Sequence, residues 1–149
     1  MNFSDKIERE LFLPVPITRV WDAIATADGL THWFSNRVTL DLREGGEIKF
    51  TWNDHGTSNG RIERLEPPHT FAYRWQAHTV PDNEALTPEN STVVTFSLAE
   101  VENGTQLSVV ETGFSSLQTA VREQNFQENV SGWRVELQEL VDYLTGEPA

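Results

Sequence analysis

Cysteine is absent from the 149-residue chain, which excludes disulfide bonds, thiolate metal sites and thiol catalysis. The absence also hints at a reducing compartment. Long hydrophobic runs are missing as well. The N-terminal segment MNFSDKIERELFL carries charges where a signal peptide needs apolar residues, and no stretch approaches the length of a membrane-spanning helix. We therefore expect a cytoplasmic protein.

Basic residues are scarce: 11 Lys and Arg stand against 23 Asp and Glu, a formal net charge of −12 at pH 7. Such a molecule repels the phosphates of nucleic acids and of anionic lipids unless it carries a local basic stripe, and the sequence has none. We expect neither nucleic-acid binding nor membrane insertion. The simplest interpretation of the charge is that it keeps a small domain soluble.

Internal repeats, low-complexity blocks and linker-like stretches are also missing. The chain is 38% hydrophobic and 23% charged, which is typical of a folded domain. Residues 1–149 are therefore predicted to form a single domain.

The predicted elements change type along the chain. Residues 6–13 alternate as a strand does, whereas 14–34 show helical spacing that is interrupted at Asp28-Gly29 and ends near Phe34. Six strands are then predicted, and segment 115–130 is left open as helical or partly mobile. Turn residues separate the strands, most clearly Asn103-Gly104, and 79–90 is predicted as a long loop. The strand segments are 37–42, 46–53, 61–66, 70–77, 91–100 and 105–114.

A final helix is predicted over residues 131–144. One face is apolar and the opposite face is polar and assigned to solvent: the apolar face holds Trp133, Leu137, Leu140, Val141 and Leu144, and the polar face holds Arg134, Glu136, Gln138, Glu139 and Asp142. Consecutive strands with short turns indicate an antiparallel sheet. The fold class is therefore α+β: a curved antiparallel sheet of about seven strands, with two short helices after the first strand and a long C-terminal helix packed across it.

This order of motifs resembles the START-related helix-grip (SRPBCC) superfamily, and within it the branch of activators of the heat-shock protein 90 ATPase. The resemblance rests on PVPITRVWDAIATADGLTHWF (14–34), DLREGGEIKF (41–50), GRIERLEPPHTFAYRW (60–75), TVVTFSL (92–98), VVETGF (109–114) and GWRVELQELVDYL (132–144). It implies a sheet that grips the C-terminal helix around a cavity. Lipid carriers, polyketide cyclases, hormone receptors, drug-sequestering proteins and chaperone regulators share this fold, so the fold does not choose a function.

Signs of catalysis are few. The histidines at 32, 55, 69 and 78 have no spacing that would place two nitrogens on one metal, and no G-x-S-x-G or phosphate-binding glycine loop is present. No catalytic residue, metal or cofactor is predicted.

Large aromatic side chains on the strand faces carry more information. Rigid rings on a curved sheet either fill the core or leave gaps that accept a small molecule. The residues predicted to line such a cavity are Trp33, Phe50, Trp52, Phe71, Tyr73, Trp75, Phe96, Glu111 and Trp133.

Glu111 is the most informative single residue, because it shares a strand face with Leu107 and Val109 and so points inward. A buried carboxylate must be hydrogen-bonded, paired or neutral. Three interpretations stay open: a structural pairing with Arg61, Arg74 or a backbone amide; an anchor for a ligand; and a general acid or base.

The favoured hypothesis is a domain that binds a small apolar or aromatic molecule between sheet and helix, without chemistry. One alternative is an enzyme of the polyketide cyclase or hydrolase type that uses Glu111. The other is a protein-interaction module that contacts a chaperone or a second copy of the chain. An enclosed cavity favours the first hypothesis, and a filled core with an exposed apolar patch favours the last.

Overall fold

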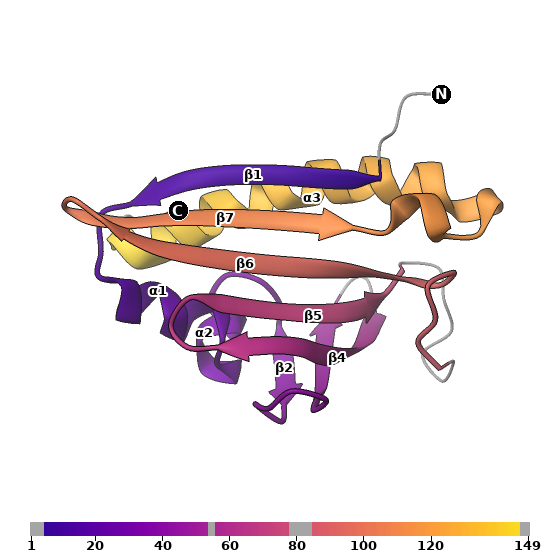
Figure 1. Ribbon diagram of the computed structural model, residues 1–149, viewed down its shortest axis with the longest axis horizontal. Helices are drawn as coiled ribbons and strands as arrows, with labels where there is room; N and C mark the ends of the chain where they lie inside the picture. The colour runs from indigo at the N-terminus through magenta and orange to yellow at the C-terminus, as the bar shows by residue number, and fades with distance from the viewer. Residues whose placement is uncertain (1–4, 54–55, 78–84, 147–149) are drawn as a thin grey trace.

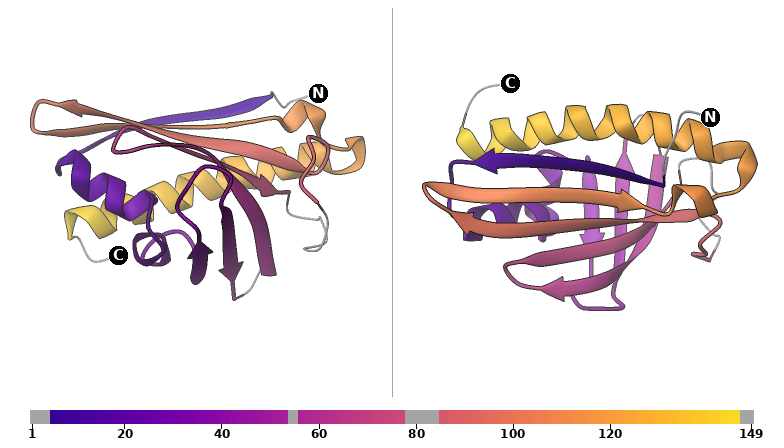
Figure 2. Two further views of the ribbon diagram at one scale, coloured as in Figure 1. Left: turned by 60° about the horizontal axis from the view of Figure 1, so that its bottom comes forward. Right: turned by 45° about the horizontal axis from the view of Figure 1, so that its top comes forward.

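The computed structural model describes residues 5–53, 56–77 and 85–146 and confirms the predicted α+β fold. Seven antiparallel strands form one curved sheet in the order β1-β7-β6-β5-β4-β3-β2 (Figure 1). Figure 2 shows the long helix α3 crossing one face of this sheet. The elements are β1 (Lys6–Leu13), α1 (Ile17–Ile24), α2 (Ala27–Thr31), β2 (Arg37–Leu40), β3 (Glu47–Trp52), β4 (Gly56–Glu66), β5 (Thr70–Gln76), β6 (Ser91–Val101), β7 (Gly104–Thr112), the short 3-10 helix η1 (Phe114–Ser116) and α3 (Thr119–Thr145).

Alternation along the strands decides which side chains face the helix. In β7, Leu107, Val109 and Glu111 are buried, whereas the residues between them are only partly buried. The turn between β6 and β7 places Asn103 at φ 69°, a left-handed conformation that asparagine tolerates better than most residues. The hairpin predicted at Asn103-Gly104 is therefore present.

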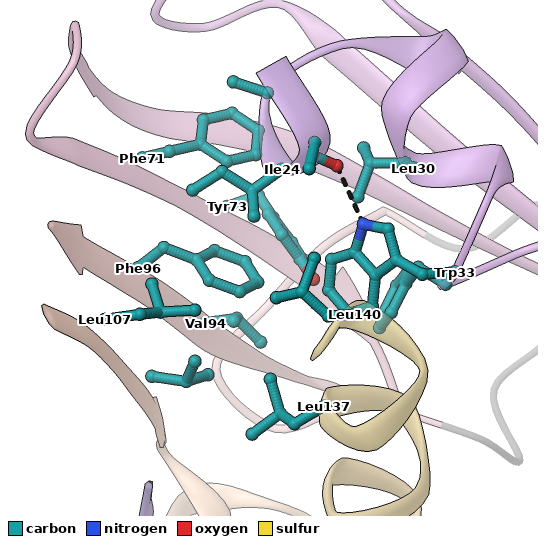
Figure 3. Packing of buried hydrophobic residues seen from close by; sticks show 14 of the residues in the cluster. Ile24, Leu30, Trp33, Phe71, Tyr73, Val94, Phe96, Leu107, Leu137 and Leu140 are labelled. Carbon is teal, nitrogen blue, oxygen red and sulfur yellow. Dashed lines mark hydrogen bonds between the residues drawn. The ribbon is translucent and has the colours of Figure 1, made fainter. Parts of the chain in front are cut away.

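The two short helices connect β1 with β2 and bring aromatic residues to the sheet. Helix α1 buries its apolar side, and α2 is capped by Thr26, whose side chain accepts a hydrogen bond from the backbone N–H of Gly29 at 2.9 Å. Just beyond α2, the Trp33 indole donates to the carbonyl oxygen of Ala23 at 2.8 Å (Figure 3). This bond satisfies the buried indole and fixes the segment that leads to Phe34.

Helix α3 is longer than predicted. It begins at Thr119 rather than near Ser131. Segment 115–130, for which the sequence analysis left a helix or a partly mobile stretch as alternatives, therefore contains the end of η1 and the first turns of α3. The predicted apolar stripe packs on the sheet: Trp133, Leu137, Leu140 and Leu144 are buried. Figure 3 shows Leu137 and Leu140 facing Phe96, Tyr73 and Val94. No helix formed by the described residues is long and apolar enough to cross a membrane.

The start of β4 also differs from the sequence prediction. Strand β4 begins at Gly56, not at Arg61, because residues 56–60 pair with β3 although they carry little apolar signal. His55, His78 and part of the predicted loop 79–90 lie outside the described residues.

Candidate functional site

The carboxylate of Glu111 is completely buried where the sheet meets the middle of α3. Its Oε2 accepts hydrogen bonds from the Thr92 hydroxyl at 2.6 Å and from the Trp75 indole at 2.9 Å. Its Oε1 accepts one from the Trp133 indole at 2.8 Å, and the Asn129 amide nitrogen lies 3.0 and 2.9 Å from Oε1 and Oε2. All four partners are neutral donors.

These donors come from three elements that the fold brings together. Trp75 and Thr92 face each other in the register of β5 and β6, and β6 pairs in turn with β7, which carries Glu111. Asn129 and Trp133 are four residues apart on α3, so they lie one turn apart on the same face. The carboxylate thus ties the centre of the sheet to the helix.

Two opposing effects act on the protonation of Glu111. Burial raises its pKa above the usual range, and hydrogen bonds from Thr92, Trp133, Trp75 and Asn129 lower it and offset part of that rise. Donors that all point at the two oxygens satisfy the carboxylate form, because a protonated carboxyl would itself need an acceptor.

The predicted structural pairing of Glu111 with Arg61 or Arg74 is wrong. The Arg61 guanidinium forms an ion pair with Glu63 at 3.0 Å, and that of Arg74 donates to the Ser91 hydroxyl at 3.0 Å. The reason is the alternation of side chains along β4, which places Arg61 on the exposed face of the sheet, opposite to the face that the helix covers.

A pocket of about 380 Å³ opens beside this network, between the β3–β6 part of the sheet and the middle turns of α3. This is the size of a small-molecule site. It is lined by Phe34, Trp52, Thr57, Ser58, Trp75, Gln76, Ala77, Thr92, Phe114, Asn125, Glu128, Asn129, Gly132, Trp133 and Glu136.

Four aromatic rings form one wall of the pocket. The ring of Phe34 lies 5.8 Å from that of Trp52, 5.7 Å from Trp75 and 5.6 Å from Trp133, measured between centroids. The three indole N–H groups are already engaged, because Trp52 donates to the carbonyl of Phe34 at 2.8 Å and the other two donate to Glu111. The rings therefore offer a ligand their carbon surface.

Two buried oxygen atoms near this wall have no hydrogen-bond partner among the described residues: the Tyr73 hydroxyl and Oε2 of Glu136. Burial, with a smaller contribution from Glu139, raises the pKa of Glu136 to about 8. Burial raises the pKa of Tyr73 well above its ordinary value, and the charges of Glu111 and Glu136 add to the rise. Figure 3 shows the Tyr73 hydroxyl pointing from the sheet toward α3 beside Leu140.

The nine residues predicted to line a cavity divide into two groups. Trp52, Trp75 and Trp133 line the pocket. The other six are buried in the core or behind the pocket wall and are not lining residues: Trp33, Phe50, Phe71, Tyr73, Phe96 and Glu111. Glu111 lies directly behind the wall, and all four of its hydrogen-bond donors line the pocket.

Sequence reasoning missed the polar lining of α3 and wrongly assigned Glu136 to solvent. Asn125, Asn129, Trp133 and Glu136 are spaced by 4, 4 and 3 residues, which is one helical face. This spacing could have revealed them, but a search for apolar stripes passes over a face that is polar because it borders a pocket.

Among the described residues, no group of three or more His, Asp or Glu is placed to hold a metal ion. His32 stacks on Tyr143 with ring centroids 4.7 Å apart, and His69 contacts the carbonyl of Leu98 at 3.2 Å. Neither lines the pocket.

Comparisons with known proteins agree with the observed fold. The chain is similar to DynU16 from the dynemicin biosynthetic locus (19% identity, TM-score 0.76, 97% of this chain and 49% of that chain), and so spans about half of its length. It is also similar to CalU16 from Micromonospora echinospora, with 26% sequence identity and a TM-score of 0.73 over 97% of this chain and 76% of that chain. A third similar structure is the Aha1 dimer from Colwellia psychrerythraea, with 23% identity and a TM-score of 0.73 over 97% of this chain and 98% of that chain.

No curated protein matches the chain in sequence. The family model of the activator of Hsp90 ATPase homolog 1-like proteins matches residues 14–145, which is most of its length. The chain therefore belongs to the family of activator of Hsp90 ATPase homolog 1-like proteins.

Proposed function

We propose that the protein binds a small apolar or aromatic molecule in the pocket between the sheet and α3. The observation that carries this proposal is the wall of Phe34, Trp52, Trp75 and Trp133 beside an open volume of about 380 Å³. Apolar and aromatic walls with a few polar groups are typical of small-molecule sites.

The engaged indoles support a binding role over accidental packing. Because each N–H group already has a protein acceptor, a ligand can cover the rings without stranding a buried donor. The Glu111 network also fixes the positions of Trp75 and Trp133 in advance, which lowers the ordering cost of binding.

A protein-interaction role has less support. The large exposed apolar side chains among the described residues are Phe12, Leu42, Val101 and Val135, which lie on β1, after β2, at the end of β6 and on α3. Single exposed apolar residues are normal on protein surfaces.

A pocket-filling variant tests the proposal. Gly132 lines the pocket, and a Cβ added there meets no atom within 4 Å, so Gly132→Leu fills open space. The substitution also favours the helix, because glycine costs about 1 kcal/mol in a helix interior. Ser131→Leu, at the exposed neighbouring position, is the matched control.

The probe is N-phenyl-1-naphthylamine, a neutral dye that fluoresces in apolar surroundings. We expect saturable binding with quenching of tryptophan emission in the wild type and in Ser131→Leu, and a loss of affinity of at least about tenfold in Gly132→Leu. Equal binding by all three proteins would place the dye elsewhere and contradict the proposal.

A further inference from the structure

The charge of the pocket is one-sided. No lysine, arginine or histidine is found among the described residues that line it, whereas Glu128 and Glu136 contribute two carboxyl groups. Glu111 lies directly behind the wall, and the whole chain carries a formal net charge of −12. This distribution repels anions and attracts cations toward the pocket.

One carboxyl oxygen of Glu136 has no hydrogen-bond donor among the described residues. Its Oε2 is buried and unpartnered among the described residues, and a buried acceptor without a donor is costly. The titratable groups coupled to it are acidic or neutral: the charge of Glu139 on the same helix acts on Glu136, and Glu136 in turn acts on Tyr73 of β5. The structure contains a carboxyl group whose missing partner is a cation or a donor.

The aromatic wall, like the Glu136 carboxyl group, is suited to a cation. A cation placed over an indole face is attracted by the negative electrostatic potential of the ring. Hydrogen bonds from Trp75 and Trp133 to the Glu111 carboxylate draw the indole N–H dipoles away from the pocket and leave the ring surface for a ligand. Trp133 and Glu136 are three residues apart on α3, so ring and carboxyl group face the same space.

We propose that the pocket selects ligands that carry a protonated amine on an apolar or aromatic body, with the ammonium group at Glu136 and the body against the indoles. This inference rests on the proposed function and names the ligand class. The alternative is a neutral Glu136 that donates a hydrogen bond to a ligand oxygen, and the two differ in their pH dependence.

Binding of an amine is coupled to proton release. The pKa of Glu136 is raised to about 8, so below that pH the ammonium group must displace a proton from the carboxyl. Affinity for an amine therefore rises with pH up to about 8, by at most about tenfold per pH unit. A ligand that accepts a hydrogen bond from the protonated carboxyl shows the reverse.

Three probes of one shape separate these cases: 2-(1-naphthyl)ethylamine, 2-(1-naphthyl)ethanol and 1-naphthylacetate, as cation, neutral molecule and anion. Each is titrated calorimetrically between about pH 5.5 and 8. At about pH 7.5 we expect the amine to bind about tenfold or more tightly than the alcohol, and the anion to bind least. In Glu136→Gln the amine-to-alcohol affinity ratio falls toward one and loses its pH dependence. Glu123→Gln, on the exposed surface of α3, keeps the wild-type ratio.

The outcomes distinguish this inference from the proposed function. Saturable binding of the alcohol and the neutral dye without a preference for the amine would overturn the inference and leave the proposed function standing. A preference for the alcohol or the anion that weakens as pH rises would assign Glu136 as a donor and also overturn it. Failure of every probe and of the dye would overturn both. Thermal melts of each variant confirm that it is folded.

Discussion

Replacing Glu111 by glutamine removes one hydrogen-bond acceptor from the centre of the molecule while keeping the shape of the side chain. The carboxylate oxygens accept from Thr92 at 2.6 Å, Trp133 at 2.8 Å and Trp75 at 2.9 Å, besides Asn129. Glutamine has one oxygen and one NH₂ group. In either orientation its NH₂ group faces an indole N–H, that of Trp133 or that of Trp75.

The expected cost follows from that mismatch. A buried donor left without an acceptor costs about 1–3 kcal/mol, and relief from burying a charge offsets part of the weakening of the remaining bonds. We expect Glu111→Gln to lower the free energy of unfolding by about 1–3 kcal/mol. This is less than the loss expected if an arginine had been stranded, because no cation contacts the carboxylate in the described structure.

Urea denaturation followed by far-UV circular dichroism measures this loss of unfolding free energy. The control is Glu100→Gln at the exposed end of β6, whose free energy of unfolding should stay within about 0.5 kcal/mol of the wild-type value. Trp133→Phe removes the facing N–H and keeps a ring. In the Glu111→Gln background it should cost at least about 1 kcal/mol less than in the wild type. A Glu111→Gln protein as stable as the wild type, or additive losses in the double variant, would refute the reasoning.

Two further predictions concern the helix and the pocket. Leu140 is fully buried and Val135 is 55% exposed. In the same denaturation assay, Leu140→Ala should therefore lower the free energy of unfolding by about 2–5 kcal/mol and Val135→Ala by less than about 0.5 kcal/mol. Equal losses in the two variants would contradict the orientation of α3. The pKa of Glu136 is about 8 in the folded chain against its usual 4.5, so the stabilising contribution of this carboxyl is complete below about pH 4.5 and is lost as pH rises toward 8. Glu136→Gln should therefore show a flatter decline of stability than the wild type between about pH 5 and 8, and identical slopes would disprove the buried position of the carboxyl.

Strand alternation and helical spacing, both readable in the sequence, determined much of the fold. The period of two in residues 105–114 places Glu111 on the inner face, and the spacing of Trp133, Leu137 and Leu140 places the helix on the sheet. These patterns are local, because each depends only on where successive side chains point.

The partners of Glu111 could not be read in this way. Its donors come from β5, β6 and α3, and only the pairing of strands and the docking of the helix bring Trp75, Thr92 and Asn129 within hydrogen-bond distance. Many neutral groups could have satisfied the same carboxylate, so a pairing with Arg61, Arg74 or a backbone amide was one interpretation among several.

The sequence by itself determined a curved sheet covered by a helix and an inward carboxylate at Glu111. Only the tertiary structure decided that α3 begins at Thr119, that Glu136 is half-buried and that an open pocket adjoins the aromatic wall. The physical reason is common to all three. The helix borders a cavity over its middle turns and is not fully packed there, so its inner face carries Asn125, Asn129 and Glu136 where an apolar stripe would otherwise run. In the sequence, a polar helix face that borders a pocket has the same residue pattern as a face exposed to solvent, and only the position of the sheet opposite the helix distinguishes the two.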